Sequence, residues 1–140
     1  MEIPVGLGTD GTRVSSYGPW PSIYWAVTGK TAGGLKLWQP QDVLSRYQAL
    51  KLMTQGSAWM SGEEKLKGTL AKGQYADVVI LPQDYFSMDV EQIKTLESAL
   101  TIVNGKVVYA GEQFKQLAPP ALEVKPDWSP VKHYGGYQNR

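Results

Sequence analysis

Alternating apolar and polar positions at the start of the chain predict a short strand. Ile3, Val5 and Leu7 alternate with small or polar residues and lead into Gly8-Thr9-Asp10-Gly11, a glycine turn of the kind that ends a strand. Asp10 therefore lies at the C-terminal tip of the predicted strand. A strand needs a partner in a sheet, and nothing upstream in the chain supplies one.

Two helices are predicted next. Pro21 can open a short helix over residues 22–27, which Gly29 would close. A longer helix is expected from Pro40, which suits a first helical turn, to about Gly56. Apolar residues recur through it at helical spacing and form a broad stripe, made of Val43, Leu44, Tyr47, Ala49, Leu50, Leu52 and Met53.

From residue 66 the pattern changes to that of strands. A β-branched run over residues 76–81 is stopped by Pro82, and one or two helical turns are expected within 89–96. Strands over 99–103 and 106–109 are joined by Asn104-Gly105, the strongest short hairpin signal in the chain. We expect the strands of residues 76–109 to pack against the helix of residues 40–55.

Length and composition describe one ordinary domain. The 140 residues are 42% hydrophobic and 19% charged, with a net charge of +1, so the charge gives no case for nucleic acid or a membrane surface. The absence of cysteine excludes disulfides and thiolate metal sites. No apolar run approaches the roughly 20 residues that span a bilayer. The compartment stays open: cytoplasmic or, with an upstream signal, periplasmic or secreted.

Asp10 is the first candidate for chemistry. A carboxylate at the C-terminal tip of a parallel strand could bind a divalent metal or act as a general base. The alternative, which local chemistry alone favours, is an Asx-type turn that only closes the strand. Arg13 could contact a carboxylate or phosphate of a substrate, or could equally pair with a nearby acid.

Other catalytic motifs are missing or weak. The single histidine, His133, lies in a tail rich in proline and glycine, where a solvent-facing side chain is expected. Gly29-Lys30-Thr31 lacks the earlier glycine of a P-loop, since Tyr24 occupies that position. No serine lies in a Gly-x-Ser-x-Gly context. The Trp and Tyr cluster from Tyr17 to Trp25 could line a substrate pocket, although a packing role is favoured.

The order of these segments resembles the amidohydrolase superfamily. The resemblance rests on Gly8-Thr9-Asp10, on Thr54-x-Gly56-x-Ala58, on residues 67–81 (KGTLAKGQYADVVIL) and on residues 101–109 (TIVNGKVVY). Residues 19–31 look like the branch described as metal-dependent hydrolases with a TIM-barrel fold. Together the matching segments cover nearly the whole chain, roughly residues 3 to 135.

This resemblance implies an α+β fold that forms part of a larger enzyme. Residues 1–60 would form the last β/α unit of a (β/α)8 TIM barrel, and 61–114 the C-terminal strands of a small composite β-sandwich domain. Residues 115–140 would be an extended, proline-rich tail. Asp10 matches the strand-8 aspartate that binds metal and takes a proton from the attacking water, and Arg13 is the candidate substrate-binding residue.

The implied activity is hydrolysis of C–N (amide-type) bonds in a small-molecule substrate. The full-length enzyme would use a divalent metal, which we expect to be zinc. The family's His-x-His pair, bridging residue and further histidines are missing from these 140 residues, so the isolated chain is expected to be inactive. Two alternatives stay open: a non-catalytic binding or structural module, and one subunit of a split hydrolase. A homo-oligomer would cover apolar surface left exposed.

Overall fold

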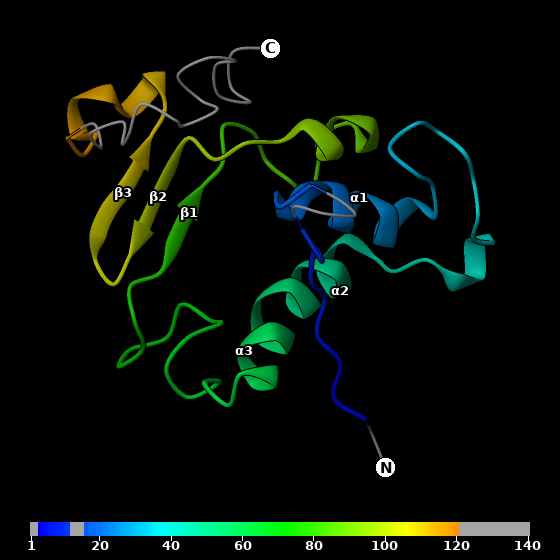
Figure 1. Ribbon diagram of the computed structural model, residues 1–140, viewed down its shortest axis with the longest axis horizontal. Helices are drawn as coiled ribbons and strands as arrows, with labels where there is room; N and C mark the ends of the chain where they lie inside the picture. Colours follow the sequence, from blue (N-terminus) through cyan, green and yellow to red (C-terminus); the bar gives the residue numbers. More distant parts are fainter. Residues whose placement is uncertain (1–2, 12–15, 121–140) are drawn as a thin grey trace, which may run out of the picture.

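The computed structural model describes residues 3–11 and 16–120, which form an α+β structure with a helical part beside a small sheet (Figure 1). The helical elements include α1 (Pro19–Thr28), α2 (Arg46–Lys51), the π-helical turn η2 (Leu52–Gly56), α3 (Ser57–Met60) and the 3-10 helix η3 (Val90–Thr95). The strands are β1 (Val78–Ile80), β2 (Leu100–Val103) and β3 (Lys106–Ala110). The 3-10 helices η1 (Pro40–Asp42) and η4 (Glu112–Leu117) complete the order in the described residues.

The sheet is antiparallel throughout, in the order β1-β2-β3. The predicted hairpin is confirmed: Asn104 and Gly105 join β2 to β3 with φ values of 49° and 75°, the left-handed pair that a tight hairpin turn requires. The Asp77 carboxylate accepts a hydrogen bond from the Asn104 N–H at 2.7 Å. This bond ties the turn to the chain just before β1.

Helix α1 confirms the predicted short helix and extends it by a turn at its start. Pro19 and Pro21 lie in its first turn, where a missing N–H costs nothing. Gly29 ends it with φ 67° and donates its N–H to the Trp25 carbonyl at 2.8 Å. A Cβ on Gly29 would lie 2.6 Å from the Trp38 Cβ, so both the conformation and the space demand glycine.

The predicted helix beginning at Pro40 is wrong in its start and its end. Pro40–Asp42 forms only a 3-10 turn, and Val43 is extended at ψ 154°. The helix begins after Ser45, whose hydroxyl accepts from the Gln48 N–H while the Gln48 side chain accepts from the Ser45 N–H. This capping box fixes the start more firmly than a proline does. The helix then continues past Gly56 through a π-helical turn, η2, to Met60.

The N-terminal strand is also a wrong prediction: residues 3–10 form no strand. They run as an extended segment beside η2 and α3 (Figure 1). The Leu7 N–H donates to the Leu52 carbonyl at 3.1 Å, so a helix rather than a neighbouring strand supplies the partner. Alternation of apolar residues sets an extended backbone, but strand pairing also needs an adjacent strand.

The main core lies between α1, α2 and the segment around η3. Its buried side chains are Ile23, Tyr24, Ala26, Ala49, Tyr85, Met88, Ile93 and Leu96. Within the described part of the chain, this cluster takes no residue from β1, β2 or β3. The expected packing of the strands on the helix of residues 40–55 is therefore wrong.

The sheet leaves apolar surface exposed. Val79 is 52% and Val108 50% exposed, and Leu70 in the loop before the sheet is 81% exposed. No helix within residues 3–11 and 16–120 is long and apolar enough to cross a membrane.

Candidate functional site

The segment that leads to Asp10 is fastened to the π-helical turn through both backbone groups of Leu7. Its N–H donates to the Leu52 carbonyl at 3.1 Å, and its carbonyl accepts from the Ser57 hydroxyl at 2.9 Å. These two partners, Leu52 and Ser57, are joined by the π-helical turn. The Ser57 N–H closes that turn by donating to the Leu52 carbonyl in an i→i−5 bond.

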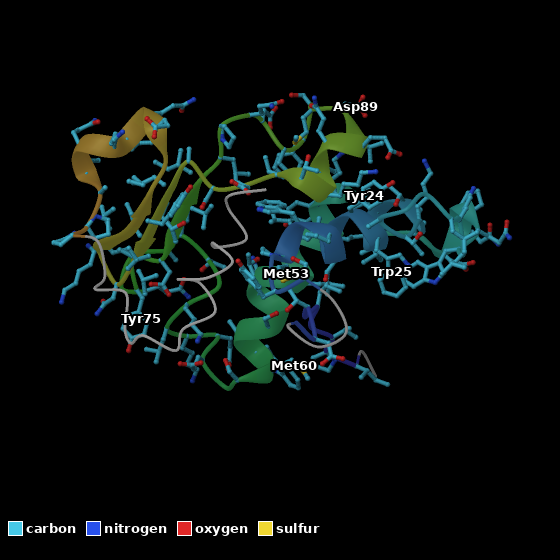
Figure 2. All side chains as sticks on the ribbon, turned by 45° about the horizontal axis from the view of Figure 1, so that its top comes forward. Tyr24, Trp25, Met53, Met60, Tyr75 and Asp89 are labelled. Carbon is cyan, nitrogen blue, oxygen red and sulfur yellow. The ribbon has the colours of Figure 1, made fainter. Side chains whose placement is uncertain are left out.

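Two glycines allow the segment to lie directly on the helix. A Cβ on Gly56 would collide with the Val5 carbonyl oxygen and lie 3.0 Å from the Gly6 Cα. A Cβ on Gly6 would lie 2.9 Å from the Met60 Cγ; Met60 is labelled at the lower end of the helix in Figure 2. The contact is therefore backbone against backbone, which only glycine permits.

Asp10 follows this fastened segment, three residues after Leu7. Asp10 is exposed to solvent, and its φ of 47° lies in the left-handed region. Aspartate tolerates this conformation better than most residues, but the backbone is still strained. The following Gly11 packs on the chain at Tyr17, where a Cβ would lie 2.6 Å from the Tyr17 Cα. Asp10 is thus presented to solvent between two packed positions.

The described residues do not fit a catalytic metal by themselves. Among residues 3–11 and 16–120, no three His, Cys, Asp or Glu side chains lie close enough together to hold an ion. A catalytic zinc usually takes three protein ligands, and Asp10 supplies one carboxylate. What the arrangement offers alone is a single solvent-facing carboxylate, able to accept a proton or to bind as one ligand of a larger set.

Two other candidates fall outside the described residues. Arg13 lies within 12–15 and His133 within 121–140. Their predicted roles, substrate binding for Arg13 and a solvent-facing side chain for His133, stay predictions.

A groove of about 700 Å³ lies beside the start of α1. One wall is the sheet face of Val79, Thr101 and Tyr109, and another is the beginning of α1 with Tyr17 and Trp20. The aromatic cluster from Tyr17 to Trp25 contributes both to the core and to this groove, and its role toward a substrate stays a prediction. Tyr24 is fully buried in the core, whereas Tyr17 and Trp20 line the groove.

The pattern of the sequence did not reveal a polar cluster at Glu91. Its carboxylate accepts from Tyr24 Oη at 2.9 Å, Lys30 Nζ at 2.8 Å and Lys94 Nζ at 3.2 Å. Hydrogen bonds from Lys30, then Tyr24, then Lys94 lower the Glu91 pKa from 4.5 to about 2. Figure 2 labels Tyr24 and Asp89, which precedes η3. The cluster links α1, η3 and the loop at Lys30.

Only the Glu91–Lys94 pair could have been noticed beforehand, because i,i+3 spacing places the two residues on one face of a helix. Lys30 belongs to Gly29-Lys30-Thr31, which lacks the earlier glycine of a P-loop, and it forms an ion pair with Glu91. Ser57 was also missed. A serine inside a helix commonly bonds to its own helix, so its bond to Leu7, fifty residues earlier in the chain, leaves no signal in the sequence.

Comparison with known proteins identifies the class. The profile described as the amidohydrolase family matches residues 1–109. The chain therefore belongs to the amidohydrolase family, a family of hydrolases whose members usually depend on metal.

A curated relative is the Bacillus subtilis (strain 168) protein named "Putative amidohydrolase YtcJ", with 41% identity over 68 residues. The match covers 49% of this chain but 13% of the relative's length. No solved structure matches the chain significantly.

Proposed function

We propose that this chain is the C-terminal part of a metal-dependent amidohydrolase that hydrolyses C–N (amide-type) bonds in a small-molecule substrate. The observation that carries the proposal is Asp10: a solvent-facing carboxylate with φ 47°, in the Gly8-Thr9-Asp10 motif of a chain that belongs to this family. A packed segment on one side and a packed glycine on the other hold it in place.

In this proposal residues 1–60 belong to the last β/α unit of a TIM barrel. Residues 61–114 contribute to a composite β-sandwich domain, and residues 115–140 form its tail. The sheet has exposed valines on its surface. This feature suits a chain that packs against further strands.

Asp10 would be one metal ligand and the group that accepts a proton from water. The divalent metal, which we expect to be zinc, would activate that water. Its remaining ligands would come from outside these 140 residues, which hold one histidine. Arg13 would bind the substrate. The isolated chain would then be inactive.

The test compares two aspartates in the protein translated from the complete reading frame that contains this chain. Asp10→Asn keeps the size of the side chain and removes its charge, and Asp42→Asn does the same at another exposed position. The substrates are an anilide, a cyclic amide and N-acyl amino acids. We expect Asp10→Asn to lower kcat/KM by about a hundredfold or more, and Asp42→Asn to leave it within about twofold. Equal activity of the two variants would overturn the role of Asp10.

A second candidate function is a non-catalytic binding module, and the groove beside α1 favours it. Tyr17, Trp20 and Tyr109 line that groove, and aromatic walls with a few polar groups are typical of small-molecule sites. A complete reading frame without a His-x-His pair, whose product hydrolyses none of these amides, would support the module. Co-purification of a separate histidine-rich protein would instead indicate a subunit of a split hydrolase.

We also propose that the isolated chain forms a homo-oligomer, because Leu70, Val79 and Val108 are at least half exposed. Light scattering after size-exclusion chromatography tests this. A monodisperse species of about the 15.5 kDa chain mass would contradict it.

A further inference from the structure

We propose that Ser57 is a positioning residue for Asp10, and that the π-helical turn it closes is the support on which the Asp10 segment is mounted. This inference rests on the proposed function, because it matters to catalysis only if the Asp10 carboxylate acts in the reaction. It adds a residue, remote in sequence and away from the reacting atoms, that fixes where the carboxylate lies.

The first support is the pair of bonds to Leu7. Ser57 Oγ donates to the Leu7 carbonyl at 2.9 Å, and the Leu7 N–H donates to the Leu52 carbonyl at 3.1 Å. One residue of the extended segment is thus held on both its donor and its acceptor. Rotation of either peptide group that flanks the Leu7 Cα would break one of these bonds.

The second support is the π turn itself. Ser57 donates its backbone N–H to the Leu52 carbonyl across five residues, and its hydroxyl also approaches that carbonyl at 3.2 Å. A regular α-helical turn bonds across four residues. It would therefore place the Ser57 side chain at a different position around the helix relative to the Leu52 carbonyl. Single π turns of this kind are frequent at functional sites.

The third support is the short distance along the chain from Leu7 to Asp10. Two residues, Gly8 and Thr9, separate them, and Gly11 directly after Asp10 packs against the Tyr17 backbone. The carboxylate is therefore carried on a short span fixed at both ends. Releasing Leu7 frees one end and lets the carboxylate move, and a displacement of about 1 Å at a catalytic group can cost about a hundredfold in rate.

The experiment first measures hydrogen exchange of backbone amides in the 140-residue chain, with three serine variants. Ser57→Ala removes the hydroxyl, and Ser57→Thr restores one. Ser61→Ala is the matched control, because the Ser61 hydroxyl donates locally, to the Ala58 carbonyl three residues earlier. The Ala49 amide, fully buried and bonded to Ser45, reports on global folding in the same spectra.

We expect exchange at the Leu7 amide to rise about fivefold in Ser57→Ala, the factor that one hydrogen bond corresponds to. Exchange at Ala49 should change by less than about twofold. Ser57→Thr should restore the Leu7 value, and Ser61→Ala should leave it unchanged. Equal exchange at Leu7 in Ser57→Ala and the unaltered chain would overturn the inference, and so would a rise at Leu7 that Ala49 matches.

The second readout is turnover by the protein from the complete reading frame. Ser57→Ala should lower kcat about tenfold with KM within about twofold, and Ser57→Thr should recover most of it. If Asp10→Asn leaves turnover unchanged, the proposed function fails. If Asp10→Asn abolishes turnover while Ser57→Ala keeps kcat, the positioning role alone fails.

Discussion

Replacing Gly56 with alanine tests the close contact that holds the N-terminal segment on the helix. Gly56 has helical angles, φ −60° and ψ −45°, so alanine fits its backbone and should gain about 1 kcal/mol in helix propensity. Its Cβ, however, would collide with the Val5 carbonyl oxygen and lie 3.0 Å from the Gly6 Cα. Backbone atoms on both sides of a contact cannot rotate away as a flexible side chain can.

The cost of Gly56→Ala in the free energy of unfolding can be estimated in two ways, which give similar values. Overpacking that shifts the segment costs about 1–3 kcal/mol. Detaching the segment instead loses the two hydrogen bonds at Leu7, each worth about 1 kcal/mol net. Subtracting the propensity gain of about 1 kcal/mol leaves a net loss of about 1 kcal/mol in the free energy of unfolding. The change in the global free energy of unfolding is small, because alanine stabilises the helix itself. The local effect on the segment at Leu7 is large.

The global and the local effect of Gly56→Ala therefore need separate measurements. Urea unfolding followed by tryptophan fluorescence gives the global change, and hydrogen exchange at the Leu7 amide gives the local one, which should rise by about tenfold or more. Gln55→Ala, at the exposed neighbouring position, is the control and should stay within about 0.5 kcal/mol. A Gly56→Ala variant that is more stable by about 1 kcal/mol, with Leu7 exchange unchanged, would refute the contact.

Three further predictions concern other parts of the fold. Ile93→Ala empties a fully buried position in the core and should cost about 2–5 kcal/mol in urea unfolding; a loss below about 1 kcal/mol would contradict the assignment of the core. The Glu91 pKa is lowered to about 2, so its stabilising contribution is present above pH 4.5 and is lost as the pH falls toward 2. Unfolding curves of Glu91→Gln should therefore lose pH dependence in that window, and profiles parallel to the unaltered chain would count against the cluster. Gly105→Ala, at φ 75°, should cost about 1–2 kcal/mol, whereas Gly33→Ala, with no left-handed φ and a Cβ that would meet only the Thr31 hydroxyl at 3.9 Å, should be near neutral.

The elements set by local chemistry could be predicted from the sequence. Asn104-Gly105 specifies a tight hairpin because both residues accept positive φ, and Gly29 ends α1 for the same reason. The start of the second helix could also have been found, since Ser45 and Gln48 have the spacing of a capping box. The helix begins at Arg46, six residues after the start that Pro40 predicts.

The elements that depend on distant partners could not. Alternating apolar residues gave an extended segment at residues 3–7, but the sequence does not say whether a strand or a helix will bond to it. The apolar faces of the strands and of α2 were recognised, yet periodicity names a buried face and not the surface that covers it. The core formed instead with η3, around Ile93.

For the candidate site, the sequence supplied Asp10 through its glycine turn and its family motif. It gave no indication of how the turn is held. Leu7 and Ser57 are joined by a hydrogen bond across fifty residues, and Gly56 was noticed only as a helix end. Contacts of this kind arise from the fold as a whole, so they become visible only once the chain is folded.

We propose Asp10 as one ligand of a metal site whose other members lie outside this chain. The most direct test is the divalent metal content of the purified 140-residue chain after extensive dialysis, measured together with Asp10→Asn and Asp42→Asn. We predict far less than one metal per chain in all three. About one tightly held metal per chain, kept in Asp42→Asn and lost in Asp10→Asn, would contradict the account and would make this chain a metal site in its own right.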